Sequence, residues 1–151
     1  NNKFNLLNNP FGIIFNPYSI LELLTACLDD KPIDLLAERD GITYSYLIHS
    51  EISEINKESY NQKVNSLQLE VKEKLTKADT LLITFGTAWV YRLIEEGRIV
   101  ANCHKSDASL FTKELLEVDT ITNNFNIFLN KLCQIYDFLF LNELLRRYIP
   151  T

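Results

Sequence analysis

Residues 81–105 have the sequence LLITFGTAWVYRLIEEGRIVANCHK, and this stretch decides the expected fold. It begins with a nearly continuous apolar run, residues 81–85, which is typical of a strand covered on both faces. Gly86 then lets the chain turn without a Cβ in the way. In open α/β sheets, ligands bind beyond the carboxyl ends of such strands, so the polar residues that follow are expected to form half of a site. The alternative is an ordinary strand with a glycine turn and no site.

The segment before this strand predicts a helix. Over residues 57–78 the apolar positions recur every three or four residues, and mainly Lys, Glu, Gln and Asn fill the positions between them. The apolar positions are Tyr60, Val64, Leu67, Val71, Leu75 and Ala78. A helix followed at once by a buried strand favours a layered α/β domain.

Further elements follow from the same rules. Asn16-Pro17 is a typical helix start, with Asn as the cap and Pro at the first helical position. The other predictions are a strand over 11–15, a helix from 17 to about 28, strands over 33–37 and 42–48 joined by a turn at 39–41, a hairpin of 89–93 and 99–101, a helix over 120–136 and a short helix over 142–151.

Composition narrows the function classes. The 151 residues and 46% apolar content predict one globular domain, residues 1–151. Fifteen basic residues are scattered among twenty acidic ones, and the net charge of −5 argues against a nucleic-acid partner. No apolar run approaches the length of a membrane span, and no signal peptide is evident at the start. We therefore expect a cytoplasmic protein.

The cysteines and histidines limit the chemistry available. Three widely spaced cysteines signal neither a disulfide framework nor a zinc knuckle, so no metal and no cofactor is expected. His49 and His104 are the two histidines, so a histidine base is one of them or lies outside this sequence. Cys103 and His104 are sequence neighbours, which in an extended segment point to opposite faces, so a thiolate–imidazolium pair is not expected.

Two glycines and two aromatic residues complete the candidates. Gly12 and Gly86 could offer backbone N–H groups to a developing oxyanion. Trp89 and Tyr91 alternate along one predicted strand and could line an acyl or sugar site, although such a pair is more often simple packing.

Several of these segments together resemble the GSCFA domain family. They are Asn-Pro-Phe-Gly (9–12), Phe-Asn-Pro (15–17), His-Ser (49–50), Thr-Phe-Gly-Thr-Ala-Trp-Val-Tyr-Arg (84–92) and Val-Ala-Asn-Cys-His-Lys (100–105), with Phe111. Both order and spacing agree, and the similarity covers about residues 4–135.

The resemblance implies a three-layer α/β sandwich around a mostly parallel sheet, similar to SGNH (GDSL-like, flavodoxin-like) hydrolases. It also implies hydrolysis of acyl esters, with a small-molecule or glycan ester as substrate. By this analogy Gly12, Thr87 and Asn102 are candidate oxyanion donors. His49, Gly86, Trp89, Tyr91 and His104 are candidate substrate-binding residues.

Some parts of the family pattern are missing from residues 1–151. The Gly-Ser-Cys-Phe-Ala motif with the presumed nucleophile is expected before Asn1. The Ser-Pro-Val-Arg-His and His-Pro segments, expected after a strand near residues 138–141, are also missing, so the fold is expected to be incomplete here. The leading hypothesis is a hydrolase whose catalytic Ser and His lie outside these residues. A noncatalytic carbohydrate- or acyl-binding module and a plain α/β scaffold are the alternatives.

Overall fold

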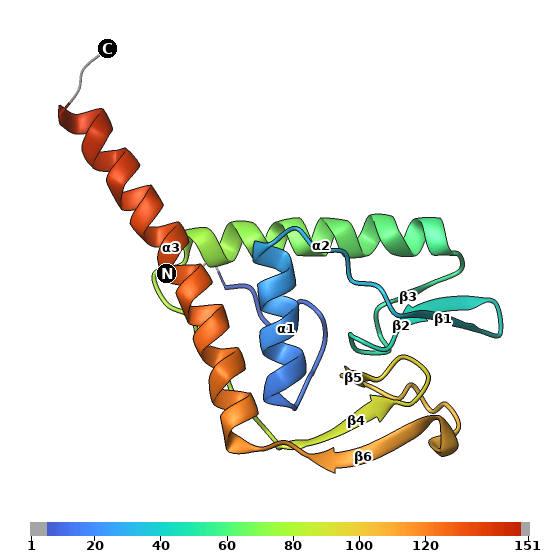
Figure 1. Ribbon diagram of the computed structural model, residues 1–151. Helices are drawn as coiled ribbons and strands as arrows, with labels where there is room; N and C mark the ends of the chain where they lie inside the picture. Colours follow the sequence, from blue (N-terminus) through green and yellow to red (C-terminus); the bar gives the residue numbers. More distant parts are fainter. Residues whose placement is uncertain (1–5, 149–151) are drawn as a thin grey trace.

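A computed structural model describes the backbone of residues 6–148 and the side chains of residues 6–136. This part of the chain is an α/β structure with three α-helices (Figure 1). The elements are α1 (Pro17–Leu28), β1 (Leu36–Arg39), β2 (Ile42–Ser45), β3 (Ser53–Glu54), α2 (Lys57–Lys77), β4 (Trp89–Leu93), β5 (Arg98–Val100), the 3-10 helix η1 (Ala108–Leu110), β6 (Phe111–Leu115) and α3 (Val118–Tyr148).

The strands form two small antiparallel sheets. One has the order β1-β2-β3 and the other the order β5-β4-β6, and every pairing between described strands is antiparallel. The predicted mostly parallel sheet is therefore wrong, and so is the SGNH-like three-layer sandwich built around it. Short turns join β1 to β2 and β4 to β5, and β3 and β6 pair antiparallel with β2 and β4. Parallel strands would need long crossover connections.

The first two helices begin where the sequence predicts. The Oδ1 atom of Asn16 accepts a hydrogen bond of 2.8 Å from the Ser19 backbone N–H, and Pro17 occupies the first turn of α1. Asn56 caps α2 in the same way, accepting from the Ser59 N–H at 2.8 Å. These side chains satisfy backbone donors that a helix N-terminus leaves without an intrahelical partner.

Both predicted hairpins are present; the strands of the first are shorter than expected, and in the second β4 has the predicted bounds while β5 begins and ends one residue earlier. Asp40 and Gly41 connect β1 to β2 with φ values of 53° and 74°, as a tight hairpin turn requires. Gly97, at φ 62°, closes the β4–β5 hairpin. The sequence did not predict β3 or β6; β6 extends the second sheet by pairing with β4.

Two predicted strands, residues 11–15 and 81–85, are wrong. Both segments lack regular secondary structure, and Leu82 is 85% exposed rather than buried. Near their ends, the Phe15 carbonyl accepts backbone hydrogen bonds from the N–H groups of Gly86 and Thr87. An apolar run becomes a strand only when a neighbour satisfies its backbone, and the described residues provide no such neighbour along residues 81–85.

The last helix is longer than predicted. The sequence placed a helix over 120–136 and a second short helix over 142–151, with a strand near 138–141 implied between them. In the structure α3 runs without interruption from Val118 to Tyr148, so the expected strand is wrong. Residues 149–151 lie outside the described residues.

The main core lies among the three helices. α1 packs against both α2 and α3, and the buried side chains of this cluster include Leu21, Tyr60, Val64 and Phe128 (Figure 1). A second cluster joins the two sheets through Tyr44, Tyr46, Leu93 and Val100, and a third lies under β4 and β5. Within the described residues, no helix has the length and apolar character needed to span a membrane.

Candidate functional site

Residues 11–15 connect two of the predicted site segments. The Phe11 carbonyl accepts a hydrogen bond of 3.0 Å from the His49 N–H. Four residues later, the Phe15 carbonyl accepts from the N–H groups of Gly86 at 2.8 Å and Thr87 at 3.3 Å. The structure therefore brings Gly12, His49, Gly86 and Thr87 to one short segment, although they are far apart in the sequence.

Gly12 makes close contact with His49. A Cβ atom at position 12 would lie 2.2 Å from the His49 Cβ, and the φ angle of Gly12 is 76°. Both conditions favour glycine. The Gly12 N–H donates to the Asn9 carbonyl at 2.8 Å. In this arrangement Gly12 closes a turn against His49, and its N–H, a predicted oxyanion donor, is engaged within the protein.

The backbone donors of Gly86 and Thr87 are also engaged, because both point at the Phe15 carbonyl. A Cβ at position 86 would lie 3.1 Å from the Phe15 Cδ1, so a larger residue would crowd that ring. The Thr87 Oγ1 accepts from the Trp89 N–H at 3.1 Å, which leaves the hydroxyl hydrogen as the donor that Thr87 can offer.

Asn102 is a predicted oxyanion residue whose side-chain amide has a donor without a partner among the described residues. Its backbone N–H donates to the Tyr46 carbonyl at 3.2 Å, and its Oδ1 accepts from the His104 N–H at 2.7 Å. No described residue accepts a hydrogen bond from its Nδ2. Because two bonds fix the residue, the half-buried amide is oriented with its NH₂ group available.

His104 is a buried histidine. Its side chain stacks on the Tyr44 ring with centroids 4.5 Å apart, and its Nε2 lies 3.1 Å from the Ile48 carbonyl. Since a carbonyl only accepts, Nε2 carries the hydrogen. Burial lowers the pKa of His104, and the carbonyls of Ile48 and Ser45 oppose that effect. The residue thus joins the 101–105 loop to the segment that leads to His49.

His49 has a more accessible side chain, which is 26% exposed. Its Nδ1 accepts a 3.3 Å hydrogen bond from the Glu51 N–H and lies 3.5 Å from the Glu51 carboxylate. The Nε2 atom makes no hydrogen bond to a described residue. Of the two histidines, His49 is therefore the one that can meet a ligand.

Trp89 and Tyr91 lie on β4 and are 48% and 43% exposed. No ring contact or hydrogen bond among the described residues joins either side chain to His49 or His104. Hydrogen bonds thus join His49, Gly86 and Thr87 to residues 11–15, and Asn102 to His104. The Trp89 and Tyr91 side chains form an exposed aromatic pair on β4.

Sequence reasoning missed the role of Tyr46. Its carbonyl accepts from the N–H groups of Ala101 and Asn102, and its hydroxyl lies 3.1 Å from the Ser106 Oγ. Burial raises the pKa of Tyr46. The period-two spacing of Tyr44 and Tyr46 was a usable signal, because it places both rings on one face of the predicted 42–48 strand. β2 ends at Ser45, but the rings of Tyr44 and Tyr46 both lie against His104.

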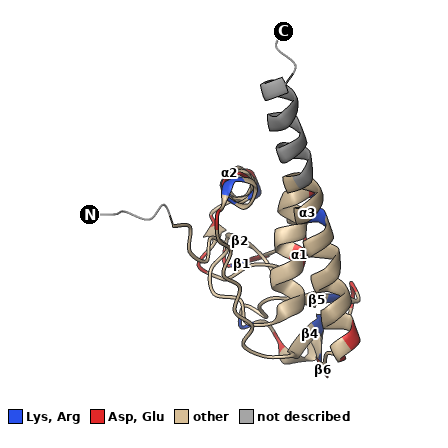
Figure 2. Ribbon diagram, turned by 90° about the vertical axis from the view of Figure 1, so that its left-hand side faces the viewer, with Lys and Arg blue, Asp and Glu red and all other residues tan. Residues whose placement is uncertain are grey.

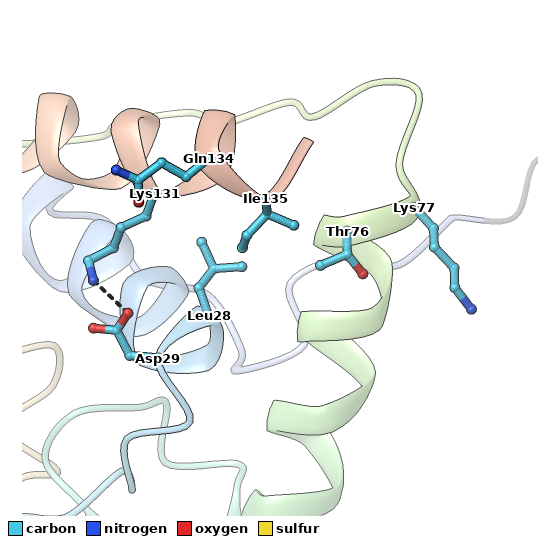
Figure 3. A pocket seen from close by; sticks show the side chains of 7 residues that line it. All are labelled: Leu28, Asp29, Thr76, Lys77, Lys131, Gln134 and Ile135. Carbon is cyan, nitrogen blue, oxygen red and sulfur yellow. Dashed lines mark hydrogen bonds and ion pairs between the residues drawn. The ribbon is translucent and has the colours of Figure 1, made fainter. Parts of the chain in front are cut away.

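Two cavities occur elsewhere in the described residues. One, of about 530 Å³, lies where the ends of α1 and α2 meet α3, and Figure 3 shows the Asp29–Lys131 ion pair of 2.5 Å at its wall. Hydrogen bonds from Lys131 and Lys31 lower the pKa of Asp29. The second, of about 430 Å³, lies between β1 and the β4–β5 turn and has Tyr46 in its wall. None of the predicted site residues lines either cavity.

Charge in the described part of the chain is mixed. Figure 2 shows basic and acidic positions on the same elements. Some ion pairs join segments that are distant in the sequence, as in Lys72–Asp30, Arg98–Asp34 and Arg92–Glu114, whereas others are local, such as Lys77–Glu73 within α2. Within residues 6–136, no group of three or more His, Cys, Asp or Glu side chains could hold a metal ion.

Comparison with known proteins identifies the family. The model of the GSCFA family matches residues 1–139, which is most of the chain. Searches of curated proteins and of solved structures found no match. The match includes all the segments that carry the resemblance, from Asn-Pro-Phe-Gly at 9–12 to Asn-Cys-His-Lys at 102–105. The chain belongs to the GSCFA family.

Proposed function

We propose that the protein is a serine-dependent acyl-ester hydrolase with chemistry of the SGNH/GDSL type, acting on a small-molecule or glycan ester. The catalytic Ser and His are contributed from outside residues 1–151. Family membership supports this proposal, and so does the grouping of Gly12, His49, Gly86 and Thr87 around residues 11–15.

The free amide of Asn102 is the observation that carries the proposal. Attack of a serine on an ester carbonyl creates an oxyanion, and preorganised donors at that oxygen supply much of the rate enhancement. Asn102 meets this requirement because its Oδ1 is held by the His104 N–H and its Nδ2 has no partner among the described residues. The Thr87 hydroxyl is a second donor, and the accessible His49 Nε2 is a substrate contact.

The test separates donor chemistry from folding. Asn102→Asp keeps the Oδ1 acceptor for the His104 N–H and removes the Nδ2 donor. We expect kcat for p-nitrophenyl butyrate to fall about 10²- to 10³-fold, as for other oxyanion donors, in the protein that includes the catalytic serine. Asn61→Asp, an exposed change on α2, is the matched control and should leave kcat unaltered.

A fluorophosphonate probe gives an independent readout, because it labels activated serines. Mass spectrometry should find the label on one serine, and ester hydrolysis should disappear when that serine is changed to alanine. If neither labelling nor hydrolysis is detected, the hydrolase proposal is rejected.

A noncatalytic carbohydrate- or acyl-binding module is the second candidate. The observation that favours it is the internal engagement of the Gly12, Gly86 and Thr87 N–H groups, since an oxyanion hole needs free donors. Saccharide binding without ester hydrolysis would support this candidate.

We also propose a cytoplasmic location. Cys27, Cys103 and Cys133 are unpaired thiols, which suits a reducing compartment. Burial raises the pKa of Cys27 to about 12 and also raises that of Cys103, so both thiols are poorly reactive.

A further inference from the structure

The second sheet has one buried face and one partly open face. Successive residues of β4 point to opposite faces. Val90 is 1% exposed and packs in the cluster with Ile99 and Leu116. Trp89 and Tyr91 point the other way and are 48% and 43% exposed. Two neighbouring aromatic side chains are therefore exposed on one face of a sheet whose other face packs in a hydrophobic cluster.

The neighbouring strand adds an apolar residue and a charge to this open face. In the β4–β6 register, Leu115 lies opposite Trp89 and Lys113 lies opposite Tyr91. The Lys113 Nζ is 4.8 Å from the centroid of the Trp89 ring. We call Trp89, Tyr91, Lys113 and Leu115 the β4–β6 platform.

The charge on this platform is not neutralised within the protein. Lys113 makes no ion pair with a carboxylate of the described residues, whereas its sequence neighbour Glu114 pairs with Arg92. Arg98, on β5, pairs with Asp34. An ammonium group without a carboxylate partner, beside two exposed aromatic rings, favours a ligand that carries a negative charge next to an apolar face.

We infer that the β4–β6 platform binds an acidic sugar, a pyranose that carries a carboxylate. The C–H face of the sugar ring stacks on Trp89 and Tyr91, and the carboxylate pairs with Lys113. The two side chains are about 7 Å apart along the strand, so neighbouring units of an oligosaccharide can be stacked together. This inference rests on the proposed function, for which it names the substrate class.

Trp89 supplies a direct measurement, because it is the single tryptophan of the sequence. We would titrate the protein with α-1,4-trigalacturonate and follow tryptophan fluorescence. The neutral probe is α-1,4-galactotriose, in which CH₂OH replaces each carboxylate, and sodium acetate tests the charge alone. None of these probes contains an ester, so the result does not depend on hydrolysis.

We expect a saturable change in Trp89 fluorescence with trigalacturonate, weaker binding of galactotriose, and no saturation with acetate. Lys113→Gln should weaken trigalacturonate binding about threefold and leave galactotriose binding unchanged. Trp89→Ala should weaken both by about tenfold or more, measured by calorimetry since that variant has no tryptophan. Lys57→Gln and Leu69→Ala, exposed changes on α2, are the controls and should have no effect.

The opposite results overturn the inference. Absence of saturable binding of trigalacturonate would reject it, as would equal binding in the wild type and the Lys113→Gln variant. Equal responses to trigalacturonate and acetate would also reject it, because the sugar ring would then contribute nothing. Ester hydrolysis that persists in any of these cases would leave the hydrolase proposal standing, so the two failures are distinguishable.

Discussion

The Gly12 backbone packs directly against the His49 side chain, since a Cβ on residue 12 would lie 2.2 Å from the Cβ of His49. The contact is supported by the hydrogen bond from the His49 N–H to the Phe11 carbonyl. It fixes the start of the chain, before α1, to the loop after β2. This contact determines where the accessible histidine lies relative to residues 11–15.

We expect Gly12→Ala to destabilise the protein by more than the cost of its φ angle alone. A left-handed backbone costs a non-glycine residue about 1–2 kcal/mol, and the clash with His49 adds to it. Gly41→Ala is the control, because Gly41 has a similar φ of 74° but no atom within 4 Å of the added Cβ. Urea denaturation would measure both, and equal losses of unfolding free energy would contradict the contact.

The buried His104 predicts a dependence of stability on pH. Because the folded-state pKa is lowered from 6.5, the unfolded chain binds a proton more readily. The free energy of unfolding should thus fall as the pH drops below about 6.5, by at most about 1.4 kcal/mol per pH unit, and this contribution should be flat above that pH.

Denaturation between pH 5 and 8 would test this, with His104→Asn as the variant that removes the titrating ring. Asn is chosen because position 104 has a φ of 50°, which Asn tolerates better than most residues. The slope below pH 6.5 should be lost in that variant. An unchanged slope in His104→Asn would show that another group is responsible.

The cap of α1 predicts a moderate effect. Asn16 is 5% exposed, and its side chain satisfies the Ser19 N–H. Asn16→Ala should lower the unfolding free energy by about 1–2 kcal/mol, at the upper end for a cap because the orphaned N–H is buried. Asn56→Ala, which removes the exposed cap of α2, should cost less. The order of the two thermal midpoints would check this, and the reverse order would contradict it.

The helical core predicts the largest loss. Phe128 is fully buried on α3, and Phe→Ala changes at such positions cost about 3–5 kcal/mol. The adjacent Ile127 is 51% exposed, so Ile127→Ala should change the unfolding free energy by about 0.5 kcal/mol or less. Chemical denaturation of both variants would measure the difference. Similar values would mean that α3 packs on a different face.

The helices and hairpins could be predicted because their signals are local. The periodic apolar positions of α2, the Asn16-Pro17 start of α1 and the Asp40-Gly41 turn each need only a few neighbouring residues. β6 was missed because FTKEL has no strong strand pattern, and its burial varies little along the strand. Its conformation depends on pairing with β4, which is a contact outside the segment.

The errors have the same physical origin. An apolar run such as residues 81–85 predicts burial, but whether it forms a strand depends on a partner that its own sequence does not specify. The site was predicted in part. Sequence indicated His49, Asn102 and His104 as candidates, but only the structure shows that His104 is buried against Tyr44 and that its N–H holds the Asn102 Oδ1.

The loop of residues 79–85, before β4, is expected to be the segment that unfolds locally most easily. Between residues 79 and 85, the backbone makes no hydrogen bond to any residue that the structure describes. Its amide hydrogens are therefore expected to exchange with solvent at rates close to those of an unfolded chain, while those in the middle of α2 exchange only through larger openings. A protease that accepts Leu or Phe should make its first cut here, which separates the α1–α2 part of the chain from the second sheet and α3.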